Sequence, residues 1–83
     1  MSKIKWRKKA LRQLRKIKDR KARSTIKNAV GTLTSFPDSL NVKRLANHQY
    51  DYRLRVGNWR VFFTEAFEIV HIEEVKKRDE RTY

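Results

Sequence analysis

The sequence predicts an α+β fold in which a short N-terminal strand and a helical hairpin pack on one face of a small, mostly antiparallel β-sheet. Two alternating runs of apolar and polar residues flank Gly57-Asn58, which is typical of a β-hairpin. Apolar residues also recur at helical spacing between residues 7 and 33. Because its 83 residues contain no repeat or linker, the chain is expected to form one domain over residues 1–83.

The central hairpin covers residues 50–65, with the sequence YDYRLRVGNWRVFFTE. A two-residue loop fixes the register, so Leu54 is expected to face Val61 and Arg55 to face Arg60. Paired residues share a face of the sheet. One face is therefore apolar and carries Tyr52, Leu54, Val56, Trp59, Val61 and Phe63. The opposite face carries Asp51, Arg53, Arg55, Arg60 and Phe62.

Two helices and a first strand precede this hairpin. Residues 2–6 alternate like a strand, and helical spacing then relates Ala10, Leu11, Leu14 and Ile17. Asp19 is the expected N-cap of a second helix, which ends before Pro37. The apolar residues of this second helix are Ala22, Ile26, Ala29, Val30 and Leu33.

An edge strand is expected at residues 42–45, a turn at 65–68 and a last strand at 69–75. If Thr64 pairs with Ile69, then Phe62 faces His71 and Arg60 faces Glu73. A turn of two or four residues gives the same facing, with Val70 and Ile72 on the apolar face and His71 and Glu73 on the arginine face.

The charge is concentrated at the N-terminal end. Of the net charge of +13, residues 1–27 contribute +12, from 13 Lys and Arg against the single acid Asp19. Such a block indicates a polyanionic partner, either nucleic acid or an anionic membrane, and contact with a nucleic-acid backbone is favoured. The helix residues expected to make this contact are Arg12, Arg15 and Lys16.

Composition also excludes several classes. The chain has no cysteine, no secretory leader pattern and no run of transmembrane length, so a cytoplasmic location without membrane contact is expected. Two histidines without a carboxylate cluster give no metal site, and the absence of a Gly-rich phosphate loop argues against a nucleotide cofactor. No cofactor is therefore expected.

Arg53, Arg55 and Arg60 form a like-charge cluster that weakens a sheet. The cluster is either a solvated face balanced by Asp51 and Glu73, or a site where guanidinium groups bind phosphate. In the second case Phe62 is a platform for stacking a base. His71, kept neutral by these arginines, is then a candidate base, although a lone histidine is more often structural.

The pattern as a whole resembles the RelE/ParE superfamily of bacterial toxin–antitoxin modules. The resemblance runs from the N-terminal strand and helical hairpin through VKRL (42–45) and YRLRVGNWRVFF (52–63) to IEEVKKRDERTY (72–83). Its most specific part is the Leu-Arg-Val-Gly-Asn-Trp-Arg of residues 54–60.

The RelE-like branch implies a metal-independent, ribosome-dependent endoribonuclease that cuts mRNA in the A site and has a cognate antitoxin. By position, the resemblance implies that Arg60 and Arg78 stabilise charge, Arg53 and Arg55 hold the RNA backbone, and Tyr83 orients or stacks. Lys77, beside Arg78, is a further expected RNA contact. The resemblance implies a lysine before Arg53, at the position of Asp51, so proton abstraction stays open among His71, Asp51 and a group of the substrate or ribosome.

Two other functions remain open. ParE-like members share the fold but inhibit DNA gyrase without the ribonuclease residues. The joint presence of Arg60, Arg78 and Tyr83 favours the ribonuclease branch. The other alternative is a nucleic-acid-binding regulator that is not a toxin.

Overall fold

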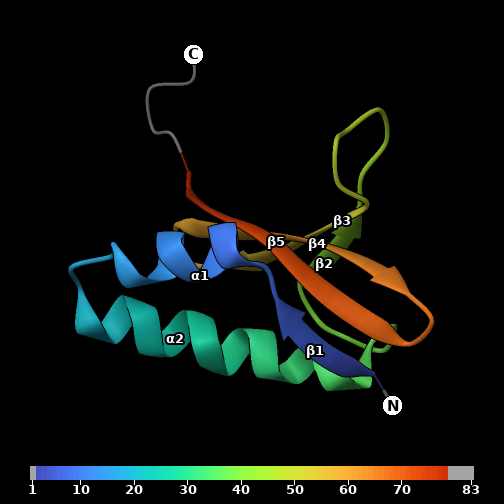
Figure 1. Ribbon diagram of the computed structural model, residues 1–83, viewed down its shortest axis with the longest axis horizontal. Coiled ribbons are helices and arrows are strands. Elements are labelled where there is room, and N and C mark those ends of the chain that lie inside the picture. Colours follow the sequence, from blue (N-terminus) through green and yellow to red (C-terminus); the bar gives the residue numbers. More distant parts are fainter. Residues whose placement is uncertain (1, 79–83) are drawn as a thin grey trace.

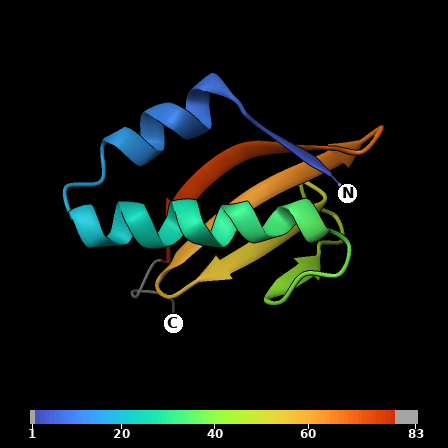
Figure 2. The same ribbon diagram turned by 90° about the horizontal axis from the view of Figure 1, so that it is seen from below.

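Two helices cover one face of a five-stranded sheet in the computed structural model, which describes residues 2–78 (Figure 1, Figure 2). The strand order is β1-β5-β4-β3-β2; β1 and β5 are parallel and the other neighbours antiparallel. The predicted fold class is confirmed. The elements are β1 (Lys3–Trp6), α1 (Lys8–Arg15), α2 (Arg20–Gly31), the 3-10 turn η1 (Thr32–Ser35), β2 (Val42–Arg44), β3 (Tyr52–Val56), β4 (Trp59–Ala66) and β5 (Ile69–Lys77).

The helices begin and pack as their sequence predicts. Asp19 caps α2, since its Oδ1 accepts hydrogen bonds from the N–H groups of Lys21 (2.9 Å) and Ala22 (3.3 Å). In Figure 2, α2 runs across the sheet with α1 beside it. The buried residues of the two helices are Ala10, Leu14, Ile26 and Val30, and Ile17 after α1 and Leu33 in η1 are buried with them. Their spacing places them on the side of each helix that faces the sheet.

The β3–β4 hairpin has the predicted register. Leu54 pairs with Val61 and Arg55 with Arg60, across a turn in which Gly57 has a φ of 56°. A positive φ of this kind is the reason for glycine at the position. The apolar face of the hairpin joins the core, where Val61 and Phe63 are fully buried.

The β4–β5 ladder differs from the predicted register. Phe67 and Glu68 form a two-residue turn, with φ values of 52° and 62°, so Thr64 pairs with His71. The ladder then shifts between Phe62 and Phe63, because β5 contains the extra residue Glu73. This is a β-bulge. The predicted pairs Arg60–Glu73 and Phe62–His71 are therefore wrong; the facing of Val70 and Ile72 is confirmed, since both are buried in the core.

The bulge lies where β5 loses its parallel neighbour. β1 pairs with β5 only as far as Ile72, and α1 covers the edge beyond it. There the Gln13 side-chain carbonyl accepts a hydrogen bond from the Val75 N–H, at 2.6 Å. No helix within residues 2–78 is long and apolar enough to cross a membrane.

Candidate anion-binding site

Three cationic side chains stand in a row across the face of the sheet that the helices leave open. Arg55 in β3 pairs directly with Arg60 in β4, and Arg60 pairs directly with Lys76 in β5. We call Arg55, Arg60 and Lys76 the cationic row. Like charges at paired positions destabilise a sheet, and opposite charges there would contribute about 0.2–1 kcal/mol. A bound anion would relieve this repulsion.

The acids expected to balance the face do not do so. Glu73, the bulge residue, accepts a hydrogen bond from the Thr64 hydroxyl at 2.8 Å and pairs with Arg7 at 3.4 Å. Asp51 is exposed before β3, and within residues 2–78 it forms no ion pair. Neither Asp51 nor Glu73 therefore neutralises the arginines of this face, as the prediction of a charge-balanced face requires.

A buried carboxylate, that of Glu74, lies next to the cationic row in the β4–β5 ladder. Glu74 pairs with Phe62 across the ladder and is only 6% exposed. Its oxygens lie 3.4 Å from Lys76 Nζ and 3.6 Å from Lys9 Nζ, so an ammonium from β5 and one from α1 neutralise it. A buried charge needs such partners to be tolerated.

These surroundings shift the pKa values of the Glu74 carboxyl and the Tyr50 phenol. Burial alone would raise the pKa of the Glu74 carboxyl, but the ammonium groups of Lys76 and Lys9 outweigh it and hold the pKa below its usual value. Burial and then the nearby Glu74 carboxylate raise the pKa of the Tyr50 phenol. Near neutral pH, Glu74 is therefore an anion and Tyr50 keeps its proton.

Phe62 faces the open side as predicted, but it is not accessible. It is 8% exposed, and the imidazole of His48 stacks on it with ring centroids 5.0 Å apart and an interplanar angle of 14°. The Tyr50 ring is tilted relative to the Phe62 ring, with ring centroids 6.0 Å apart. A base therefore cannot stack directly on Phe62 in this conformation, which corrects the expectation of a bare platform.

His71 lies away from the cationic row. It pairs with Thr64 in β4 and Lys5 in β1, and its Nδ1 is buried without a hydrogen-bond partner among residues 2–78. The expected position beside three arginines is therefore wrong. The two-residue turn alone sets this position, because the register shift between Phe62 and Phe63 lies beyond His71 in the ladder.

The remaining predicted site residues that the structure describes are not members of the row. Arg53 pairs with Phe62 and is half-buried, and its Nε has no partner among the described residues. Arg78 follows β5, is exposed, and donates its backbone N–H to the Asn58 carbonyl at 2.6 Å. Lys77 Nζ lies 5.9 Å from the ring centre of Trp59. Tyr83 lies outside the described residues.

The basic residues predicted on the first helix form a separate surface. Arg12, Arg15 and Lys16 are all exposed on α1 or at its C-terminal end. Arg12 and Arg15 line a shallow hollow of about 340 Å³ together with Lys8 and Leu11. Helix-face cations of this kind suit contact with a phosphate backbone.

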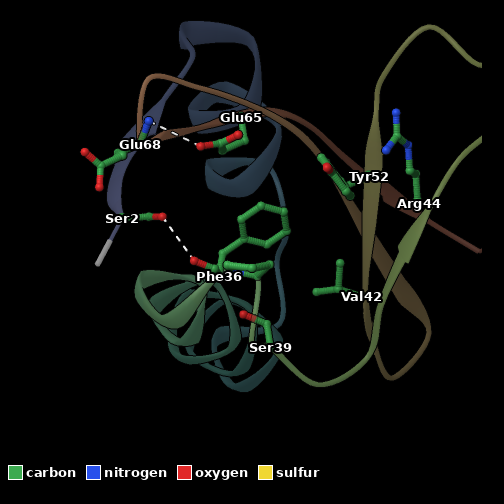
Figure 3. A pocket seen from close by; sticks show the side chains of 9 residues that line it. Ser2, Phe36, Ser39, Val42, Arg44, Tyr52, Glu65 and Glu68 are labelled. Carbon is green, nitrogen blue, oxygen red and sulfur yellow. Dashed lines mark hydrogen bonds between the residues drawn. The ribbon is translucent and has the colours of Figure 1, made fainter.

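A groove of about 600 Å³ opens on the helix side of the sheet (Figure 3). Phe36, Val42 and Tyr52 give it an apolar wall, while Glu65 and Glu68 lie on one side and Arg44 on another. No nucleophile–base pair lines it, so we do not place the chemistry there. Within residues 2–78, no three His, Cys, Asp or Glu side chains are grouped closely enough to hold a metal ion.

Sequence reasoning missed Lys76, Glu74, His48 and Tyr50 as parts of the open face. Strand alternation could have placed Lys76 and Glu74 only if the bulge at Glu73 had been recognised. His48 and Tyr50 reach Phe62 from an irregular loop, where no periodicity signals a contact.

Comparison with known proteins places the chain in a family. Residues 4–82 match the family described as ParE toxin of type II toxin-antitoxin system, parDE. A chain of the RelE–RelB complex from Pyrococcus horikoshii OT3 has the same fold, with a TM-score of 0.76 and 20% identity over 98% of both chains. A chain of the RelB–RelE antitoxin–toxin complex from Methanococcus jannaschii gives 0.73 and 20% over 88% of both.

At 20% identity, the similarity to these two structures shows a shared fold only. No curated protein matches the sequence. The family match covers nearly the whole chain. The chain therefore belongs to the ParE toxin family of type II toxin–antitoxin systems, within the RelE/ParE superfamily.

Proposed function

We propose that this RelE/ParE-family toxin is a ribosome-dependent endoribonuclease that cleaves mRNA in the A site and so inhibits translation. The observation that carries the proposal is the cationic row, in which Arg55, Arg60 and Lys76 occupy paired positions and only Lys76 has a carboxylate partner, Glu74. Fixed cations of this kind stabilise the charge that develops on a phosphate under attack.

In the proposed reaction, the 2′-hydroxyl of one nucleotide attacks the adjacent phosphate in line. The P–O5′ bond breaks and the leaving 5′-oxygen takes up a proton from water, which gives a 2′,3′-cyclic phosphate and a free 5′-hydroxyl. Arg60 and Arg55 stabilise the phosphate oxygens, with Lys76 beside them, and Arg78 stabilises the leaving oxygen. Arg53 holds the backbone, and Tyr83 orients or stacks. No step uses a metal or cofactor.

The proton of the 2′-hydroxyl has to leave, and the position of His71 weighs against it as the acceptor. His71 pairs with Thr64, four residues from Arg60 along β4. Asp51 or a group of the RNA or ribosome remains for this role. Since arginine is too basic to accept a proton at neutral pH, Arg55 and Arg60 serve only to stabilise charge.

The partners follow from the charge and the relatives. Both similar structures are antitoxin–toxin complexes, and a chain with a net charge of +13 suits an acidic cognate antitoxin. The exposed helix cations Arg12, Arg15 and Lys16 suit ribosomal RNA. We propose that the toxin acts in the cytoplasm as a single domain over residues 1–83.

The test uses purified protein, ribosomes stalled with an open A site on a defined message, and primer extension to map cuts. Cleavage within the A-site codon by the parent, and its loss in Arg60→Ala, would support the proposal. An uncut message with the parent protein would contradict it.

The family match favours a second candidate, inhibition of DNA gyrase without cleavage, as in ParE-like toxins. This alternative predicts DNA damage after induction, inhibition of supercoiling by purified gyrase, and intact mRNA. Measuring full-length mRNA and DNA breaks in the same induced culture separates the two candidates.

A further inference from the structure

Phe62 is a large apolar side chain on the face that the helices leave open. It is covered by two rings from the loop between β2 and β3, which rises away from the helices in Figure 1. His48 lies nearly parallel to Phe62, and the Tyr50 ring is tilted against both. The open face therefore holds a preformed aromatic stack beside its cations.

The outermost ring of this stack is fixed in orientation. The His48 Nδ1 accepts a hydrogen bond from the Tyr50 N–H at 3.0 Å. One face of the imidazole is in contact with Phe62, yet His48 as a residue is exposed. A flat ring surface is thus presented to solvent without needing to be ordered on binding.

The stack lies within one nucleotide of the cationic row. Phe62 is two residues from Arg60 on the same face of β4, a separation of about 7 Å along the strand. Arg53 pairs with Phe62 and has an unpartnered Nε among the described residues. A nucleotide whose phosphate lies on the row can therefore place its base over His48.

We infer that the exposed ring face of His48 is a stacking platform for a base of the RNA substrate, with Phe62 backing the imidazole and Arg53 beside it. This inference rests on the proposed ribonuclease function and adds the base contact that Phe62, being covered, cannot make. Stacking tolerates any base, because every base has a π-face. His48 therefore contributes to substrate binding more than to codon choice.

The alternative role of His48 is only to shield Phe62 from water, and a leucine separates the two roles. His48→Leu still covers Phe62 but offers no ring, whereas His48→Tyr covers Phe62 and keeps a ring. Gln49→Ala, an exposed neighbour in the same loop, is the matched control. Each full-length variant is compared with the parent for melting temperature and for kcat/KM of A-site cleavage on programmed ribosomes.

We expect His48→Leu to melt like the parent and to lose about tenfold or more in kcat/KM, mainly through a raised KM. His48→Tyr should restore activity to within a few-fold of the parent, and Gln49→Ala should match the parent. A His48→Leu protein that cuts like the parent would overturn the inference and leave the proposed function standing. A parent that does not cut ribosome-bound mRNA would overturn both.

Discussion

Lys76 lies directly opposite Arg60 in the β4–β5 ladder, and one extra residue, Glu73, is the reason. Without this bulge, alternation along β5 would give the position a different partner and facing. The fold thus places a third cation beside two arginines that already repel each other. At the bulge, Glu73 contacts Thr64 and Arg7, and the next acid, Glu74, pairs with Lys9 and Lys76, so neither carboxylate forms an ion pair with Arg60 among the described residues.

Replacing Arg60 with Ala should remove toxicity and leave the fold intact. Its repulsion from Arg55 and Lys76 is relieved, so the melting temperature should hold or rise slightly. Losing one charge-stabilising group should lower the rate of A-site cleavage by roughly a hundredfold or more.

Arg44→Ala is the matched control, because Arg44 is an exposed arginine whose strand position faces the helix side. It should cut like the parent. A folded Arg60→Ala protein that retains the parental cleavage rate would remove Arg60 from the site.

Replacing Glu74 with Gln should lower stability at neutral pH by about 1 kcal/mol, since the charge-assisted contacts with Lys9 and Lys76 are lost. The loss is small for a buried carboxylate because both lysine side chains are more than half exposed and regain water. Thermal unfolding of the parent and the variant gives the difference.

The pH dependence of this difference has a defined sign. The pKa of Glu74 is lowered in the folded protein relative to the ordinary value of 4.5, so its stabilisation is present above pH 4.5 and is lost as the pH falls through the folded value. The parent and Glu74→Gln should therefore converge in acid. Glu68→Gln, at an exposed turn position, should track the parent throughout. A gap between parent and Glu74→Gln that stays constant down to pH 3 would contradict the ion-pair account.

Leu14→Ala and Ile26→Ala should destabilise the protein without touching the open face. Leu14 is 2% exposed and Ile26 is fully buried, so each truncation leaves a cavity and costs about 2–5 kcal/mol. A domain of this size has only about 5–15 kcal/mol of stability in total. Denaturant unfolding should show the loss, and Leu40→Ala, at an 83% exposed leucine, should show almost none.

Most of the fold could be predicted because its signals are local. Gly57-Asn58 fixes the hairpin register, Asp19 begins α2, and helical spacing identifies the buried residues of both helices. The position of the β4–β5 hairpin in the sequence could be predicted, but the register of its two strands could not. Its turn uses Phe67 and Glu68 at positive φ, where glycine or asparagine is the usual signal.

Part of the candidate site also follows from local sequence signals, and the rest depends on tertiary contacts. Arg55 facing Arg60 follows from a turn that the sequence specifies. Lys76 opposite Arg60, and Glu74 buried beside it, depend on a bulge that coincides with the end of β1 pairing, which is a tertiary event. The stacking of His48 on Phe62 is also a tertiary contact. Strand alternation alone therefore predicted an accessible Phe62.

The last prediction concerns dependence on the ribosome. The cationic row can stabilise a transition state, but an open sheet face does little to bend RNA into the in-line geometry that makes a 2′-hydroxyl reactive. Orientation of reacting groups can be worth about 7–11 kcal/mol at best, so a larger scaffold is expected to supply it. Purified toxin should therefore cut free single-stranded RNA negligibly at physiological salt and cut messages held with an open A site.

Docking to that scaffold should depend on the outer surface of α1. Reversing three charges together, with Arg12→Glu, Arg15→Glu and Lys16→Glu, should weaken ribosome-dependent cutting. The gap to the parent should narrow as salt rises, because screening weakens the phosphate contacts that only the parent makes. The matched control reverses Arg20, Lys21 and Lys27 on exposed positions of α2, which changes the net charge equally. If both triple variants lose activity alike, overall charge and not the α1 surface governs docking. Efficient cutting of naked RNA that ignores both sets of reversals would instead identify a free-standing ribonuclease.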